Sequence, residues 1–362
     1  MKPSTPSFCI PRFITSIATA ACLFSGVPAV AAAAPFVVSE QFTYDTAPYP
    51  SCHASTIAET SAGDLVAAWF GGTHERNPDV CIWFARMVDG KWTEAVEVAN
   101  GLQEDGTRYP TWNPVLFQPL GGDLHLFYKV GPNPRDWWGM VMTSPDGGVS
   151  WSQAKRLPEG ILGPIKNKPI ALDDGTWLSP SSTESSETGW TAHIEITRDQ
   201  GKTWEIAGPI SRGVGLDAIQ PSILQHPDGV LQILCRTKQG TVGMAWSYDG
   251  GLKWTDMAAT ELPNPNSGTD AVTLKDGRHL IIYNHSGHMP ERSGKGVRYP
   301  LSLAVSHDGI IWKRLQDIET EPLPDGYAYP AIIQSSDGLV HITYTYGRKQ
   351  IKHVVVDPSR ID

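Results

Sequence analysis

Six β-rich segments of the sequence each begin with a polar side chain, and the six side chains differ in their chemistry. Histidine and tyrosine can exchange protons with a substrate, lysine can bind an anion, and aspartate can accept a proton or a hydrogen bond. Together they suit acid–base chemistry on a polar, charged molecule. The six residues are His53, Asn113, Lys168, Gln220, Asp270 and Tyr329.

These residues can share one place because each segment reads as the first strand of a similar hairpin. The segments are HASTI (53–57), NPVLF (113–117), KPIAL (168–172), QPSIL (220–224), DAVTL (270–274) and YPAII (329–333). The fifth residue of every segment is large and apolar, whereas the first never is. We therefore expect the six first residues to form a ring around a central pocket. The alternative is that strands simply begin with polar residues, which explains solubility but not the variety of side chains.

The second strand of each hairpin is expected to end at the same mouth of the pocket. Counting from the turn glycines places these ends at Phe70, Lys129, Ser182, Arg236, Asn284 and Thr345. Lys129, Arg236 and Asn284 therefore join the ring residues as candidates for substrate binding. In the polar loop after Lys129, Trp137 and Trp138 could stack on a sugar face or be buried.

The elements that would position these side chains form an internal repeat. A glycine marks the turn of each hairpin, at Gly63, Gly122, Gly175, Gly229, Gly277 and Gly338. These glycines are 59, 53, 54, 48 and 61 residues apart. Six units of about fifty residues that each contain a hairpin are typical of the blades of a β-propeller. The sequence therefore predicts an all-β, six-bladed β-propeller whose innermost strands line the axis.

A second repeat lies between the hairpins and has a structural explanation. The pattern Ser/Thr-x-Asp-x-Gly-x-x-Trp, an Asp box, occurs at 144–151, 197–204 and 247–254, in shortened form at 306–312, and as a remnant at 88–92. Its aspartate can accept backbone N–H groups in a tight turn, its glycine takes a positive φ, and its tryptophan packs under the hairpin. The last blade carries no box. We expect FVVSEQF (36–42) to supply its outer strand, which would close the ring.

The first 34 residues are predicted to be a secretory signal. Lys2 and Arg12 precede an apolar run from residue 14 to residue 30, and small residues follow it. This divides the chain into a signal peptide (1–34) and one propeller (35–362). The expected protein is exported, to the periplasm or beyond, and has no membrane span once the signal is removed.

Charge and cysteine content limit the partners. The formal net charge is −9, or −11 without Lys2 and Arg12, whereas nucleic-acid binding needs a basic face. Beyond the signal the cysteines are Cys52, Cys81 and Cys235, an odd number that allows one disulfide, Cys52–Cys81, or buried thiols alone. We expect neither a cofactor nor a metal. A closed propeller is self-sufficient, so we expect a monomer.

Six blades, Asp-box turns and a tyrosine opening the last blade resemble the sialidase (neuraminidase) superfamily, in its branch with BNR repeats. The resemblance covers essentially the whole chain after the signal. It implies a central pocket that cleaves terminal acidic sugars from glycans with a tyrosine nucleophile. By position, Tyr329 matches that nucleophile and Asp79 matches the acid/base. Arg236 and Arg298 match two of the family's three carboxylate-binding arginines.

Two positions depart from the family. His53 stands in place of the third arginine, and Gln220 stands in place of the glutamate that takes the tyrosine's proton. An amide has no useful basicity, and a free tyrosine, with a pKa of about 10, is a poor nucleophile at neutral pH. The resemblance therefore implies a carboxylate pocket but leaves the activation of Tyr329 to another group.

The leading interpretation is an exo-glycosidase of sialidase type acting on a terminal acidic sugar of a glycan. In this interpretation Asp79 protonates the leaving oxygen, with Asp270 or Glu75 assisting. Arg236 and Arg298 bind the carboxylate of the sugar.

Two other interpretations stay open. A lyase acting on a rhamnose–glucuronate glycan would remove a proton beside the uronate carboxylate, with His53 and Tyr329 exchanging protons and Lys168 and Gln220 helping to neutralise the acid. A non-catalytic glycan-binding propeller would keep the pocket and perform no reaction.

Overall fold

The computed structural model describes residues 1, 3–4, 34–210, 215–289 and 295–361, and its compact unit runs from Ala34 to Asp362. The predicted signal lies almost entirely outside the described residues, so its cleavage and the export of the chain stay predictions. Ala34, its last residue, packs in the core with 3% of its surface exposed. In the described part of the chain, no helix is long and apolar enough to cross a membrane.

Six antiparallel sheets account for nearly all of the regular structure. The first comprises β2 (Ser51–Glu59), β3 (Leu65–Gly72), β4 (Cys81–Val88) and β5 (Lys91–Trp92), with β6 (Val96–Ala99) also paired to β4. The second comprises β7 (Thr111–Phe117), β8 (Leu124–Val130), β9 (Trp138–Ser144) and β10 (Lys155–Arg156). The third comprises β11 (Ile170–Ala171), β12 (Trp177–Ser185), β13 (Gly189–Thr197) and β14 (Glu205–Ala207).

The remaining three sheets follow the same plan. The fourth comprises β15 (Ala218–Gln225), β16 (Leu231–Thr237), β17 (Thr241–Ser247) and β18 (Ala258–Pro263). The fifth comprises β19 (Asp270–Thr273), β20 (His279–Asn284), β21 (Leu301–Ser306) and β22 (Lys313–Glu319). The sixth comprises β23 (Tyr327–Gln334), β24 (Val340–Tyr346), β25 (Gln350–Val356) and β1 (Val37–Phe42). The predicted six-bladed β-propeller is thus confirmed.

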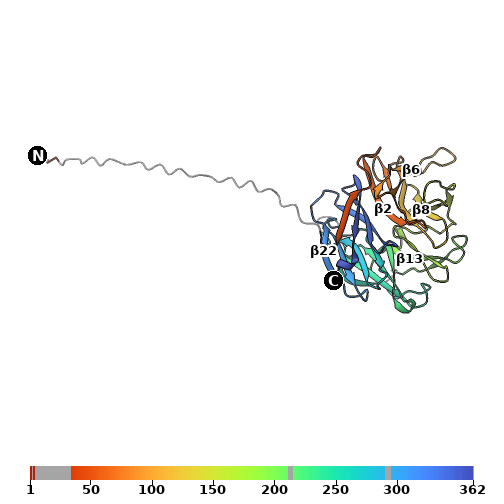
Figure 1. Cartoon of the computed structure of the whole chain (residues 1–362). Helices are drawn as coiled ribbons and strands as arrows, with labels where there is room; N and C mark the ends of the chain where they lie inside the picture. Colours follow the sequence, from red (N-terminus) through yellow and green to blue (C-terminus); the bar gives the residue numbers. More distant parts are fainter. Residues whose placement is uncertain (2, 5–33, 211–214, 290–294, 362) are drawn as a thin grey trace. The chain divides into compact units, whose positions relative to one another are not determined.

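Inner strands of neighbouring blades contact one another, and the third blade does so through β12, its second strand. β2 contacts β7, β15 contacts both β12 and β19, and β23 contacts β19 and returns to β2. The colours in Figure 1 follow the sequence, and the orange-red β1 lies beside the blue strands of the last blade. The first strands of the hairpins therefore surround a common axis, as the repeat predicts.

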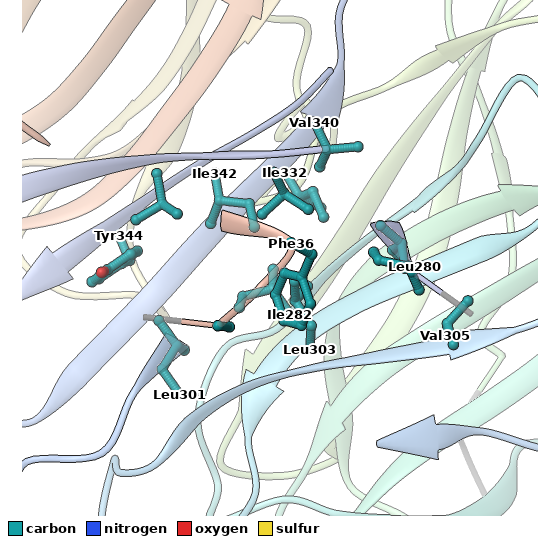
Figure 2. Close-up of a cluster of buried hydrophobic side chains, with 14 of the residues drawn as sticks. Phe36, Leu280, Ile282, Leu301, Leu303, Val305, Ile332, Val340, Ile342 and Tyr344 are labelled. Carbon is teal, nitrogen blue, oxygen red and sulfur yellow. The ribbon is translucent and has the colours of Figure 1, made fainter. Parts of the chain in front are cut away.

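The N-terminal strand completes the sixth blade, as predicted from the missing Asp box. β1 pairs with β25 over the register Val37 to Val356 and Phe42 to Lys352. Phe36, just before β1, inserts among buried side chains of the fifth and sixth blades, including Ile282 and Ile332 (Figure 2). Burial of this apolar surface stabilises the junction between the chain's two ends.

The Asp boxes have the structural role expected of them. In the box at 144–151, the Asp146 carboxylate accepts the N–H groups of Val149 (3.1 Å) and Ser150 (2.8 Å). Hydrogen bonds from Ser150 lower the pKa of Asp146 to about 2. In the box at 247–254, the Trp254 indole donates to the Gly251 carbonyl at 2.9 Å. The aspartates of the four boxes all accept hydrogen bonds from their own turns.

Four inner strands carry a β-bulge near the mouth of the pocket, and each bulge holds a residue with a left-handed backbone. These residues are Ala54, Asn113, Gln220 and Tyr329, with φ of 56°, 34°, 57° and 50°. A non-glycine residue in this region is strained, and such strain often marks a functional site. The bulge also changes the alignment of the first blade that the sequence pattern predicts. Ala54, rather than His53, occupies the position equivalent to Asn113, Gln220 and Tyr329.

Candidate functional site

The Tyr329 hydroxyl lies at the centre of a hydrogen-bonded cluster from two blades. It accepts hydrogen bonds from Arg236 Nη1 (2.9 Å) and from Gln220 Nε2 (3.1 Å). Arg236 is fixed in turn, because its Nε donates to Asn266 Oδ1 at 2.8 Å and its guanidinium lies 5.0 Å from the Trp190 ring centroid. Two donors that converge on one oxygen can stabilise negative charge on it.

Two further guanidinium groups lie near the cluster on Tyr329. The Arg298 guanidinium lies 5.8 Å from the centroid of the Tyr329 ring. Burial, followed by the charge of Arg236, lowers the pKa of Arg298 to about 10, and Arg348 and Glu75 act on it as well. Arg348, in the turn after β24, donates to Glu75 Oε2 at 2.6 Å. Arg236 and Arg298 thus lie against the tyrosine, and Arg348, held by Glu75, adds a third guanidinium whose charge acts on Arg298 and His53.

Arg348 is the functional residue that the sequence reasoning missed. The count of second-strand ends stopped at Thr345, and the turn YGRKQ (346–350) that follows was not considered. The signal that could have found it is its place: a basic side chain three residues beyond a strand end at the mouth.

His53 is buried beneath these charges and packs against Tyr329. Only 2% of its surface is exposed, and the two ring centroids are 4.2 Å apart. Its Nδ1 lies 3.1 Å from Thr345 Oγ1, which itself accepts the Ala54 N–H. Burial, followed by the charges of Arg348 and other cations, holds the pKa of His53 well below its usual value. The imidazole is therefore neutral, and the same burial and charges make it a weaker base than an exposed histidine.

Lys166, rather than Lys168, is the lysine beside the tyrosine. Its Nζ lies 5.9 Å from the Tyr329 ring centroid and donates to Thr269 O at 2.9 Å and to Pro330 O. Burial lowers the pKa of Lys166 to about 7. A Cβ on Gly268 would come within 3.2–3.3 Å of Gln220, Lys166 and Tyr329, so a larger residue here would press on all three side chains.

Lys168 and Asp270, two of the predicted ring residues, bind each other. Lys168 Nζ lies 3.1 and 3.0 Å from the two oxygens of the Asp270 carboxylate, which is almost wholly buried. The same carboxylate accepts Ser222 Oγ (3.0 Å) and the N–H of Ile332 (3.0 Å). This pair joins four blades. Its charges are compensated internally, which favours a structural role, and substrate binding by these two residues stays a prediction.

The structure places the three remaining binding candidates in different surroundings. Asn113 is 5% exposed and sits at the bulge of β7. Asn284 donates to Tyr327 O at 3.0 Å and to Pro300 O at 3.4 Å, which ties the Arg298 segment to the strand that carries Tyr329. Lys129 is fully buried and donates to Pro164 O, away from the cluster on Tyr329. Their proposed contacts with substrate stay predictions.

Asp79, the expected acid, lies in the exposed loop that also carries Glu75. Its carboxylate accepts the Thr73 N–H at 3.1 and 3.2 Å and the Thr73 hydroxyl at 2.6 Å. In this arrangement Asp79 closes its own loop, and its role as the acid stays a prediction. The three cysteines, Cys52, Cys81 and Cys235, are buried free thiols.

The buried Lys129 gives a prediction about stability and pH. Burial lowers its pKa to about 7, whereas an unfolded lysine titrates near about 10.4. Between these values the unfolded chain binds more protons, so the free energy of unfolding rises with pH. Lys129→Met should reduce this slope between pH 7 and 9 by up to about 1.4 kcal/mol per pH unit. Urea unfolding at pH 7, 8 and 9 measures it.

The exposed Lys91 provides the matched control, because Lys91→Met changes a solvated lysine. That variant should keep the wild-type slope. Equal slopes for wild type and Lys129→Met would mean that Lys129 is not held at a lowered pKa.

The cluster is suited to binding an anion and to proton transfer. Arg236, Arg298 and Arg348 supply three guanidinium groups, which match the geometry of a carboxylate. Tyr329 and the neutral His53 supply groups that can donate or accept protons. Among the described residues, no set of three or more His, Cys, Asp or Glu side chains is placed to hold a metal ion.

Comparisons with known proteins agree with the fold. The family model described as a BNR repeat-like domain matches residues 63–342. Comparison with curated protein sequences finds no match. A solved protein of unknown function from Dyadobacter fermentans has 18% identity and a TM-score of 0.71, over 89% of this chain and 98% of that one.

Solved sialidases give similar values. The Hadza microbial sialidase Hz136 has 16% identity and a TM-score of 0.72, over 87% of this chain and 67% of that one. The NanB sialidase from Streptococcus pneumoniae has 15% identity and a TM-score of 0.69, over 88% and 70%. Likeness at such identities shows the fold alone. The match of the family model to most of the chain, with the six blades and their Asp-box turns, shows that this protein belongs to the BNR repeat-like domain family, as a sialidase-like propeller.

Proposed function

We propose that the protein is an enzyme that cleaves a terminal acidic sugar from glycans, as an exo-glycosidase of sialidase type. The observation that carries this proposal is the approach of Arg236 and Arg298 to Tyr329, with Arg348 close enough for its charge to act on Arg298. A planar guanidinium binds a carboxylate through paired, charge-assisted hydrogen bonds. The cluster therefore suits a sugar acid whose carboxylate faces the three arginines and whose anomeric carbon faces the tyrosine.

In this mechanism the tyrosine oxygen attacks the anomeric carbon while the bond to the leaving oxygen breaks. Arg236 and Gln220 donate to the tyrosine oxygen and would stabilise it while its proton passes to solvent water. Asp79 would give a proton to the leaving oxygen, and water would then release the sugar from the tyrosine. Electrostatic support from the arginines thus takes over part of what a carboxylate base would do.

A second candidate is β-elimination on a terminal uronate. One observation favours it: the Gln220 amide donates to the Tyr329 hydroxyl. A hydrolase of sialidase type would be expected to have a base at that position. The neutral His53 ring against Tyr329 adds a proton acceptor. In this reaction either His53 or Tyr329 removes the proton beside the carboxylate, and the other group gives a proton to the leaving oxygen. A double bond then forms in the sugar.

The test is incubation of the protein with a sialyl aryl glycoside and with a rhamnose–glucuronate oligosaccharide. Release of the aryl group would support the glycosidase. A rise in the ultraviolet absorbance of an unsaturated uronate would support the lyase instead, and His53→Ala should then abolish turnover, whereas in the glycosidase it should cause a mild loss. Binding of either glycan without any product would overturn both proposals in favour of a non-catalytic propeller.

Arg348→Ala should lower kcat/KM by roughly 10–150-fold on whichever substrate is cleaved. The change removes one charge-assisted contact with the carboxylate, worth about 1.5–3 kcal/mol. Most of the loss should appear in KM. Steady-state kinetics measures it, and Arg348→Lys should recover only part of the loss because an ammonium lacks the planar fork.

Arg198→Ala is the control, because Arg198 pairs with Glu205 on the exposed surface of the third blade. It should behave as wild type. If Arg348→Ala did the same, the third guanidinium would have no part in binding the acid.

A further inference from the structure

A cavity of about 260 Å³ opens between the second and third blades. Its walls come from the loop that carries Trp137 and Trp138, from residues 156–162, and from Glu184 at the end of β12. Neither tryptophan is fully buried. The Arg156 guanidinium lies 4.8 Å from the Trp138 ring centroid, so it covers that ring, whereas Trp137 makes an edge contact with the buried Trp112 at 5.8 Å.

Two buried charged side chains outside the cluster on Tyr329 hold one wall of the cavity in position. The wholly buried Glu195 carboxylate accepts the N–H groups of Leu162 (2.9 Å) and Gly163 (2.7 Å). Lys129 donates to Pro164 O in the same loop. Buried ionic groups are costly, and one that holds a loop rigid is typical of a preformed binding site.

The wall that carries the tryptophans is equally constrained. Gly131 has a φ of 150°, and a Cβ there would lie 2.5 Å from the Trp137 Cα. Its carbonyl accepts the Trp112 indole N–H at 2.8 Å. Trp112 directly precedes Asn113 in β7, so the position of Trp137 is tied to the inner strand that lines the axis.

Glu184 connects this cavity to the arginine cluster. It lines the cavity, and it interacts electrostatically with Arg236 and, more weakly, with Arg135 on the opposite wall. Burial raises the pKa of Glu184 above its usual value. Trp190, a hydrogen-bond partner of Glu184, lies against Arg236. A ligand held by Arg236 could therefore continue past Glu184 into the cavity.

The lining suits an uncharged sugar ring. Arg135 and Arg156 are balanced by Glu159 and Glu184, so the cavity presents no net charge to attract an ion. Carboxylate and guanidinium groups can bind hydroxyls, and the Trp137 ring offers an apolar surface for the C–H face of a pyranose. We infer that this cavity is the subsite for the uncharged sugar to which the terminal acidic sugar is attached. This inference rests on the proposed function and extends it from the acid to its leaving group.

Trp137→Ala tests the subsite by comparing two substrates that carry the same acidic sugar. One is the aryl glycoside, whose leaving group is small, and the other carries the acid on a neutral oligosaccharide. The variant should lower kcat/KM on the oligosaccharide about tenfold or more and change it less than twofold on the aryl glycoside. Trp246→Ala, on a half-buried tryptophan of the fourth blade that lines a separate cavity, should change neither. An equal effect of Trp137→Ala on both substrates, or none on either, would overturn the subsite.

A binding measurement separates the subsite from the enzyme. Saturation-transfer NMR with lactose, N-acetyllactosamine and L-rhamnose should show ring-proton signals with wild type, Tyr329→Phe and Trp246→Ala, and loss of these signals with Trp137→Ala. This result without any turnover would leave the subsite in place and reject the proposed enzyme. Absence of transfer from all three sugars to the wild type would reject the subsite, whatever the outcome of the activity assay.

Discussion

Tyr329→Phe is expected to lower kcat at least about 1,000-fold and to change KM less than about threefold. The substitution removes only the oxygen on which Arg236 and Gln220 converge. The ring remains to pack against His53, and Arg236 keeps its bond to Asn266, so the carboxylate pocket should survive. Steady-state kinetics measures kcat and KM, and titration with substrate checks that the variant still binds.

Tyr327 provides a control in the same strand. It lies two residues earlier in β23, is wholly buried, and donates its hydroxyl to Glu321 O at 2.8 Å. Tyr327→Phe removes the same atom, but the Tyr327 hydroxyl binds Glu321 O and no arginine, so the change should leave kcat within about twofold. If Tyr329→Phe kept more than a tenth of the wild-type kcat, the tyrosine would not be the reacting group in either proposed reaction.

Asp270→Asn is expected to lower the free energy of unfolding by about 3–5 kcal/mol. The carboxylate is 1% exposed and is surrounded by donors: Lys168 Nζ, Ser222 Oγ and the N–H of Ile332. An amide would remove the charge that compensates Lys168, and its NH₂ group would face another donor. Urea unfolding followed by tryptophan fluorescence measures the loss.

A double-mutant cycle with Lys168→Met isolates the ion pair. The double variant should be less destabilised than the sum of the two single changes, because it no longer contains an uncompensated charge. Asp276→Asn is the control, since Asp276 pairs with Arg278 with half of its side chain exposed, and it should cost about 0.5 kcal/mol or less. Additive effects, with a loss below about 1 kcal/mol for Asp270→Asn, would show that the pair does not hold the blades together.

The architecture could be predicted from the sequence because each blade repeats the same short sequence patterns. The turn glycines, the alternating strands and the Asp boxes are each explained within a few residues, and counting them gives six blades. Even the long-range pairing of β1 with β25 could be inferred, since one blade lacked a box and the ring needed another strand. The register of the first blade could not, because the bulge at Ala54 places Ile57 one position earlier than the apolar pattern implies.

The site was harder to predict because its residues meet only in three dimensions. Position and resemblance predict Gln220, Arg236, Arg298 and Tyr329 as neighbours, and the structure brings these four side chains together, while their roles stay predictions. Lys168 opens a strand in the sequence pattern, yet in the structure its ammonium pairs with Asp270 and the ammonium of Lys166 approaches the tyrosine. Arg348 lies in a turn whose composition is ordinary. Only the ion pair with Glu75, seen in the structure, shows which way its side chain points.

The closure of the sixth blade by β1 has a consequence for the order of folding. Val37 and Val356 pair across almost the full length of the compact unit, so this contact has a very large loop-closure cost and should form late. The strand that carries Tyr329 belongs to the same sheet. Recovery of activity during refolding should therefore lag behind the recovery of secondary structure, and a chain ending before β25 would leave the edge of β1 free to pair with other molecules.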